Sequence, residues 1–137
     1  MANYLLDTNH ASPLVTIGHP LRDKILDGLD SGHTFALCVP VISETLFGLG
    51  VLPRAKSNFE EWQRLKPFLA TYGLDANDAE QAVDLQLSLR KRGWQLASFD
   101  ALIATVALRY DLTLLTADKD FQAVDGLQAE NWLADLT

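Results

Sequence analysis

The residues of this sequence best suited to chemistry are four acidic side chains that lie far apart in the chain: Asp7, Glu44, Asp100 and Asp118. Each stands where an apolar run ends or a helical pattern begins. Asp7 directly follows an apolar run that reads as a buried strand, and a carboxylate in that position needs partners. Because the carboxyl ends of parallel strands meet at one edge of a sheet, where ligands bind, we expect the four carboxylates to converge in one crevice.

Carboxylates brought together in this way repel each other. Two unit charges ~5 Å apart cost ~3 kcal/mol at an effective dielectric constant of ~20, so such a group must bind a cation or hold a proton. Oxygen ligands alone suit Mg²⁺ or Mn²⁺, and a metal that also accepts substrate phosphate indicates phosphodiester or phosphoryl chemistry.

The other metal-binding residue types do not form a second candidate site. His10, His19 and His33 lack the spacing of zinc ligands, and the single cysteine, Cys38, lies in an expected strand. His10 is close to Asp7 in the sequence and could touch a substrate, but we expect it to be a surface residue at the start of a helix.

Each acidic residue also has a structural interpretation. Asp100 and Glu44 could favour the helix starts beside them, and Asp118 could cap the short turn Lys119–Phe121. The metal-site hypothesis therefore depends on the four residues as a set.

Four short runs rich in apolar residues predict the strands that would position these acids. They are Tyr4–Leu6, Phe35–Val39, Leu112–Thr116 and, more weakly, Leu127–Ala129. Two of them are nearly continuous in apolar residues, which is typical of strands that are covered on both faces in a parallel sheet.

Apolar residues at helical spacing predict four helices between the strands, over residues 21–29, 59–69, 79–89 and 101–108. Ser31-Gly32 and Gly93 are expected stops for the first and third. Residues 101–108 are apolar nearly all round, so that helix should be central and buried. The alternation predicts an α/β fold, a three-layer α/β/α sandwich with a short, mainly parallel sheet, and we expect residues 1–137 to form a single domain.

Length and composition exclude several classes of protein. The 137 residues are 48% hydrophobic and 21% charged, which argues against disorder. The single cysteine and the acidic start without a signal-peptide pattern favour a cytoplasmic protein. No apolar run approaches the ~20 residues that span a bilayer, so we expect no membrane association.

The net charge of −7 by itself disfavours a nucleic-acid partner. Pooling several carboxylates in one metal site weakens that objection, because the cations could then act locally. Two loose groups of cations lie within residues 54–66 and at Arg90–Arg92, although solvated helix faces explain both groups at least as well.

Four motifs, in order and at familiar spacing, resemble those of the PIN-domain nucleases. They are Leu-Leu-Asp-Thr-Asn at 5–9, Ser-Glu at 43–44, Asp-Ala-Leu-Ile-Ala at 100–104 and Leu-Leu-Thr-Ala-Asp-Lys-Asp-Phe at 114–121. Within that superfamily, the length and the motifs resemble VapC-type toxins of bacterial toxin–antitoxin modules, over essentially the whole chain. One departure is Ser98, which opens the third motif where relatives often have proline.

The resemblance implies a PIN-like fold and an acidic metal site made by Asp7, Glu44, Asp100 and Asp118. It further implies that hydroxyl and amide groups support this site, from Thr8, Asn9 and Thr116.

Asp120 is a rival to Asp118 for the fourth acidic position. We prefer Asp118 because it lies closer to the strand end, whereas Asp120 precedes Phe121, which should pack inward.

The function implied is that of an endoribonuclease dependent on Mg²⁺ or Mn²⁺, which hydrolyses RNA phosphodiester bonds with a metal-activated water. No Ser–His–Asp or Cys–His arrangement is present that would supply a side-chain nucleophile instead. As a toxin, the protein is expected to be a homodimer held inactive by a small antitoxin. The residues expected to contact the antitoxin are Phe47, Leu49, Val51, Leu52 and Trp62, although Trp62 and Phe59 could instead be buried in the core.

Two alternatives remain open at this point. A catalytically silent PIN module could bind RNA or protein without cleaving, although all four acidic positions are filled. A phosphatase of the haloacid-dehalogenase type would carry a second Asp two residues after the first, where this chain has Asn9.

Overall fold

The computed structural model of the chain describes residues 1–134 and 136. Five strands form a parallel sheet in the order β3-β2-β1-β4-β5. Their bounds are β1 (Asn3–Leu6), β2 (Thr34–Cys38), β3 (Ala70–Tyr72), β4 (Thr113–Leu115) and β5 (Ala129–Glu130). The central strand is β1, in which Leu5 pairs with Ala36 of β2 on one side and with Leu114 of β4 on the other.

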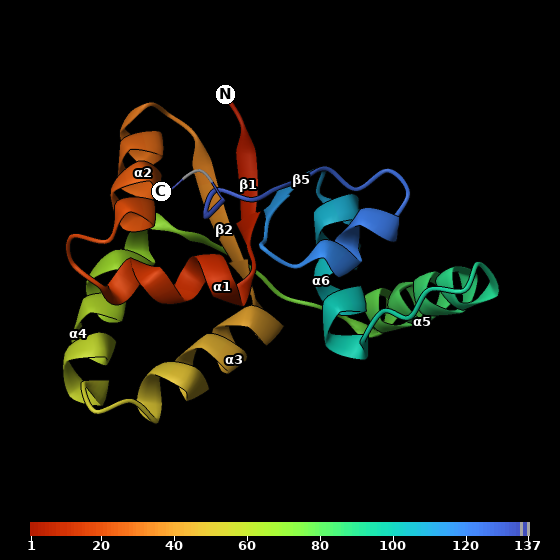
Figure 1. The fold of residues 1–137 in the computed structure, drawn as a ribbon, viewed down its shortest axis with the longest axis horizontal. Helices are drawn as coiled ribbons and strands as arrows, with labels where there is room; N and C mark the ends of the chain where they lie inside the picture. Colours follow the sequence, from red (N-terminus) through yellow and green to blue (C-terminus); the bar gives the residue numbers. More distant parts are fainter. Residues whose placement is uncertain (135, 137) are drawn as a thin grey trace.

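Six α-helices and three short 3₁₀ helices connect the strands in the described part of the chain. The α-helices are α1 (Thr8–Ala11), α2 (Pro20–Asp30), α3 (Val39–Gly50), α4 (Ala55–Leu65), α5 (Ala76–Lys91) and α6 (Ser98–Arg109). The 3₁₀ helices are η1 (Ser12–Val15), η2 (Lys66–Phe68) and η3 (Lys119–Ala123). Figure 1 shows α2 and α4 on one side of the central strands and α5 and α6 on the other, which confirms the predicted layered α/β arrangement.

The predicted strands and helices are present, with shifted ends. The second strand stops at Cys38 because Val39 already begins α3, with Pro40 in its first turn. The second predicted helix, over residues 59–69, extended too far, since α4 ends at Leu65 and Pro67 lies in η2. The edge strand β3 was missed because it is short and mostly exposed, and therefore lacks an apolar run.

Helix α6 packs at the centre of the molecule, as predicted. Ala101, Ile103, Ala104 and Val106 are fully buried. Their burial fixes the start of the helix, which carries Asp100, against the end of the sheet. No helix in the described part of the chain combines the length and apolarity needed to cross a bilayer.

The end of α5 is defined by a Schellman motif. Gly93 has φ +83°, and its N–H donates to Arg90 O at 3.0 Å. The N–H of Trp94 donates to Leu89 O at 3.0 Å. Glycine adopts this positive φ without steric cost, so the predicted stop at Gly93 is confirmed and the position of Trp94 beyond it is fixed.

Candidate active site

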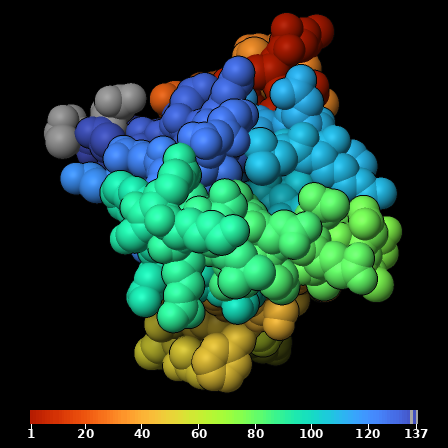
Figure 2. Space-filling model, turned by 90° about the vertical axis from the view of Figure 1, so that its right-hand side faces the viewer, coloured from red at the N-terminus to blue at the C-terminus, as the bar shows by residue number. Residues whose placement is uncertain are grey.

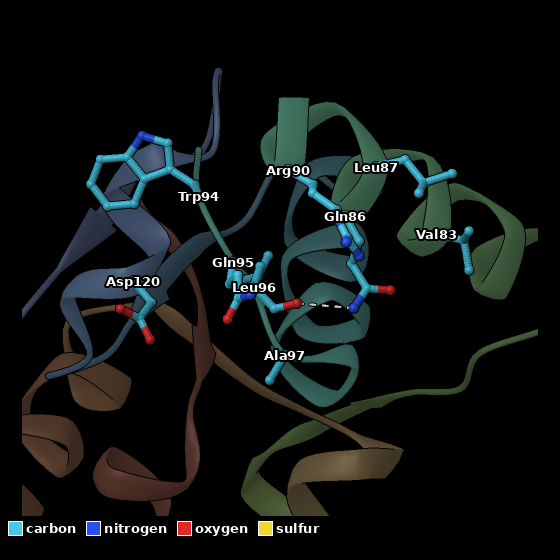
Figure 3. Close-up of a pocket in the computed structure, with 9 residues that line it drawn as sticks. All are labelled: Val83, Gln86, Leu87, Arg90, Trp94, Gln95, Leu96, Ala97 and Asp120. Atoms are coloured by element: carbon cyan, nitrogen blue, oxygen red, sulfur yellow. Dashed lines mark hydrogen bonds between the residues drawn. The ribbon is translucent and has the colours of Figure 1, made fainter. Parts of the chain in front are cut away.

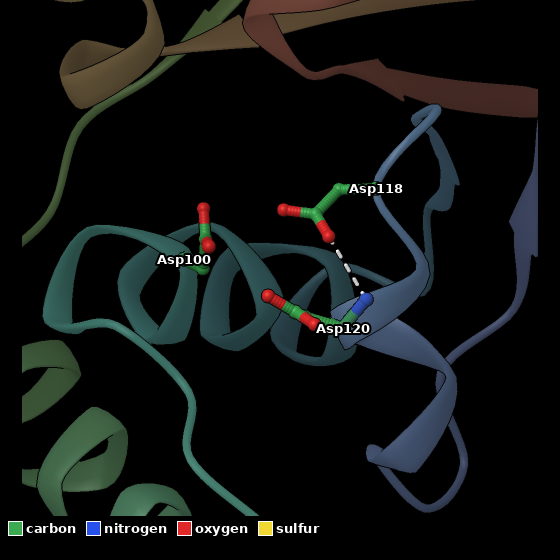
Figure 4. A group of neighbouring side chains, drawn as sticks. All are labelled: Asp100, Asp118 and Asp120. Carbon is green, nitrogen blue, oxygen red and sulfur yellow. Dashed lines mark hydrogen bonds between the residues drawn. The ribbon is translucent and has the colours of Figure 1, made fainter.

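Three carboxylates lie together where α6 begins and η3 follows β4. One oxygen each of Asp100, Asp118 and Asp120 lies within 4.8 Å of the other two (Figure 4). The Asp118 carboxylate also accepts a hydrogen bond from the Asp120 N–H at 2.9 Å and so caps η3. Both Asp118 and Asp120 therefore lie beside Asp100, and we call these three residues the acidic trio.

Asp7 stands at the carboxyl end of β1 and is almost fully buried, with 6% of its surface exposed. It caps α1, accepting from the Thr8 N–H at 2.8 Å through Oδ1. Its Oδ2 accepts from Thr116 Oγ1 at 2.7 Å and from Asn9 Nδ2 at 3.3 Å. Thr116 Oγ1 in turn accepts from the Asp118 N–H at 3.0 Å, so a single hydroxyl links Asp7 to the acidic trio.

The carboxylates raise each other's pKa values. Burial is the largest cause that raises the pKa of Asp100 to about 6, and the negative charges of Asp7, Asp118, Asp120 and Glu44 contribute the rest. Burial likewise raises the pKa of Asp7, against the lowering effect of its hydrogen bonds from Thr116 and Thr8. The four expected acids and Asp120 therefore share one electrostatic environment.

Glu44 differs from the other acids in its exposure. It is the sixth residue of α3, in the second turn, and its side chain is exposed. The interpretation that Glu44 favours the start of its helix is therefore wrong, because no acidic residue lies in the first turn of α3. Its charge still raises the pKa values of Asp7 and Asp100, which places it at the rim of the site.

The donor set fits a hard divalent cation. Every candidate donor atom of the acidic trio is a carboxylate oxygen, and burial together with the neighbouring negative charges makes ionisation of Asp100 unfavourable. A cation with 2+ charge relieves that penalty, and oxygen-only donors favour Mg²⁺ or Mn²⁺ over zinc.

Asn9 connects the site to His10. Asn9 Oδ1 accepts from the Ala117 N–H at 3.1 Å and lies 2.6 Å from His10 Nδ1. The expectation of a surface histidine is wrong, because His10 is fully buried, with 0% of its surface exposed. Its Nε2 accepts from the backbone N–H of Trp132 at 3.1 Å.

A hollow of about 570 Å³ lies beside the acidic trio, between α5 and the segment that leads into α6. In Figure 3, Asp120 and Trp94 lie on one side of the hollow, and Gln86 and Arg90 lie on the other. Gln86 donates to Leu96 O at 2.9 Å, which ties α5 to the segment before Asp100. Figure 2 shows α5 lying across this face of the molecule.

A separate apolar surface lies at the end of α3 and the turn after it. Phe47, Val51 and Leu52 are at least half exposed there. The expectation for Leu49 and Trp62 needs correction, because they are 4% and 3% exposed and belong to the core. They lie on the inward faces of α3 and α4 and present no surface to a partner.

The sequence also matches a known domain family. The sequence model of the PIN domain matches residues 4–127. The chain belongs to the PIN domain family. Membership of this family decides against the haloacid-dehalogenase alternative. Comparison with curated proteins gave no significant match.

Several solved structures share the fold. VapBC2 from Rickettsia felis, bound to a DNA fragment from its promoter, gives a TM-score of 0.82 at 24% identity, covering 95% of this chain and 98% of that chain. FitAcB from Neisseria gonorrhoeae gives 0.75 at 25% identity, covering 93% and 96%. Mycobacterium tuberculosis VapC20, described as a sarcin-ricin loop cleaving toxin, gives 0.66 at 18% identity, covering 89% and 95%. The PIN-like fold expected from the motifs is confirmed.

Proposed function

We propose that this PIN-domain protein is a metal-dependent endoribonuclease and the toxin of a toxin–antitoxin module. The observation that carries the proposal is the meeting of Asp100, Asp118 and Asp120, with one oxygen from each within 4.8 Å, beside the buried Asp7. The PIN domain match and the likeness in fold to an RNA-cleaving toxin support a nuclease.

In this proposal, Asp100, Asp118 and Asp120 hold Mg²⁺ or Mn²⁺, with Asp7 and Glu44 completing the acidic site. A bound divalent cation would activate water and neutralise the charge that develops on the phosphate. The backbone N–H of Thr8, the amide of Asn9 and the hydroxyl of Thr116 hold the Asp7 carboxylate in one orientation. The Thr8 hydroxyl, which was expected to support the site, has no hydrogen-bond partner within the described part of the chain. Hydrolysis leaves a 5′-phosphate and a 3′-hydroxyl, and no side chain acts as a nucleophile.

The hollow beside Asp120 gives an RNA strand a path to the carboxylates. Trp94 is half exposed there, and nucleobases stack on aromatic side chains irrespective of sequence. Arg90 lines the same hollow and offers a cation for a phosphate, despite the net charge of −7. Trp94 would hold an unpaired base of the substrate while the neighbouring phosphate lies at the acidic trio.

A small antitoxin is the proposed protein partner. The exposed Phe47, Val51 and Leu52 form an apolar surface at the end of α3 that such a partner could cover. Three of the similar solved structures are described as VapBC complexes or VapBC bound to DNA, in which toxin and antitoxin are together. We further propose that the protein is a homodimer and acts in the cytoplasm. Sedimentation velocity of the purified protein tests whether it is a dimer.

The decisive experiment incubates purified protein with structured RNA in Mg²⁺, in Mn²⁺ and in EDTA. We expect cleavage in either metal, none in EDTA, and 5′-phosphate ends on the products. Asp100→Asn should abolish cleavage, whereas Asp27→Asn, an exposed change on α2, should leave it unchanged. Binding of RNA without cleavage at any metal concentration would identify a silent PIN module and contradict the proposal.

A further inference from the structure

We propose that His10 is a positioning residue that fixes the orientation of the Asn9 side chain, and through it that of Asp7, in the acidic site. The backbone N–H of Trp132 holds the His10 ring in place. The inference rests on the proposed function, because it concerns the same carboxylates. Its evidence is a continuous chain of hydrogen bonds from the segment after β5 to Asp7.

The backbone at Trp132 fixes which imidazole nitrogen carries the proton. A peptide N–H can only donate, so His10 Nε2, at 3.1 Å from Trp132 N, must be unprotonated and accept. The neutral ring then carries its proton on Nδ1. That proton points to Asn9 Oδ1 at 2.6 Å, which makes His10 a donor to Asn9.

Two donors then fix the orientation of the Asn9 amide. Asn9 Oδ1 accepts from His10 Nδ1–H and from the Ala117 N–H. A flipped amide would set its NH₂ group against both donors, so the NH₂ group must face Asp7. There Nδ2 donates to Asp7 Oδ2 at 3.3 Å, and the orientation of Asp7 depends in part on His10.

The far end of the chain of hydrogen bonds is rigidly anchored. Trp132 is buried and packs edge-on against Tyr4 and Phe35, with ring centroids 4.9 and 5.7 Å apart. Its indole N–H donates to Glu130 Oε1 at 3.0 Å. Tyr4 lies on the central strand β1 and Phe35 on its neighbour β2. His10 therefore connects Asn9 to a rigid part of the core.

The two nitrogens of His10 can be replaced one at a time. His10→Gln places an amide oxygen near the position of Nε2, so it can still accept from Trp132, but it lacks the donor to Asn9. His10→Asn places an amide NH₂ near Nδ1, so it can still donate to Asn9, but it loses the bond to Trp132. His33→Asn is the matched control, since His33 accepts the Ala2 N–H through Nδ1 and has no hydrogen bond to the site.

The readouts are Mn²⁺ affinity, by calorimetry or electron paramagnetic resonance, and the melting temperature. We expect His10→Gln to weaken Mn²⁺ binding by roughly tenfold with a nearly native melting temperature, as is usual for groups that orient metal ligands. His10→Asn should lower the melting temperature further yet bind Mn²⁺ within about threefold of the wild type. Unchanged affinity in His10→Gln, or losses in both variants that follow their stability, would overturn the proposal.

Nitrogen NMR of the metal-free protein separates this inference from the proposed function. A His10 ring protonated on Nδ1, with an Asn9 side-chain resonance that shifts in His10→Gln and not in His33→Asn, supports the positioning role. A ring protonated on Nε2 overturns it. Wild-type protein that takes up no Mn²⁺ contradicts the proposed function, while the NMR result still decides the role of His10.

Discussion

Asp7 and Asp100 each contribute a carboxylate to the site, but one is surrounded mainly by hydrogen-bond donors and the other mainly by negative charges. Asp7 is 6% exposed and is held by donors from Thr8, Asn9 and Thr116. At Asp100 the pKa is raised to about 6 by burial and by four neighbouring negative charges. One side of the site is thus a fixed hydrogen-bonded framework, and the other is a group of charges that a cation would complete.

Among changes to the hydrogen-bonded framework of the site, replacing Asp7 itself should have the largest effect. Asp7→Asn removes a charge from the site and sets an NH₂ group against the donors on Oδ2, so we expect cleavage to fall at least ~100-fold. Initial rates of RNA cleavage at saturating Mg²⁺ measure this, with Asp27→Asn as the control. Removing like-charge repulsion should raise the metal-free melting temperature, and a fall of several degrees would show that Asp7 acts as a structural residue.

Thr116→Val tests the link between the two sides. Thr116 Oγ1 donates to Asp7 and accepts from the Asp118 N–H, and valine has the same shape without the hydroxyl. We expect about tenfold slower cleavage and a loss of roughly 1–3 kcal/mol in stability, because a part-buried N–H and a buried carboxylate each lose a partner. Thr116→Ser restores the hydroxyl and should restore both properties; failure to do so would mean that the methyl group matters instead.

Trp94→Ala tests the open side of the site. If a base stacks on Trp94 in the hollow beside Asp120, removing the indole should raise KM for RNA by roughly tenfold with kcat within about twofold. Trp94→Phe keeps an aromatic face and should recover most of the affinity. A fall in kcat at constant KM would instead assign Trp94 to holding the segment before Asp100.

The sequence predicted those parts of the site that depend on strand ends. Asp7 follows a buried strand and Asp100 opens an apolar helix, and both patterns survive in the structure because the core imposes them. Asp118 and Asp120 could not be separated from sequence, since both belong to a single 3₁₀ turn whose geometry brings both carboxylates beside Asp100.

The predictions that failed concern residues whose burial depends on contacts with distant parts of the chain. His10 lies in a one-turn helix, too short for a periodic pattern to show which face is buried, and its partner Trp132 is far along the chain. Trp62 and Phe47 follow similar apolar patterns, yet only Phe47 is exposed, because α4 turns Trp62 into the core. The edge strand β3 gave no signal because its residues are mostly exposed.

The smallest predicted effect is the change that Asp100→Asn makes in the metal-free melting temperature, and its dependence on pH is the sharpest test of the comparison. The pKa of Asp100 is about 6 in the folded protein and ~3.9 when unfolded, so the folded state binds more protons between these values. Without metal, stability must therefore fall as pH rises from ~4 to above 6. Allowing for solvent screening of a partly exposed group, the loss is on the order of 1 kcal/mol, or about 3 °C in Tm.

Asp100→Asn removes this loss, so its metal-free Tm should exceed that of the wild type by about 3 °C at pH 7.5 and match it at pH 4. With Mg²⁺ at pH 7.5 the wild type should have the higher Tm, because its ionised carboxylates bind the cation more strongly than those of the variant. Mg²⁺ should stabilise the wild type less at pH 5, where Asp100 is partly protonated. Thermal melts of both proteins at pH 4, 5 and 7.5, with Mg²⁺ and with EDTA, measure these differences in Tm. A difference in Tm that does not change with pH would show that the charge at Asp100 is relieved within the protein, and the contrast with Asp7 would then disappear.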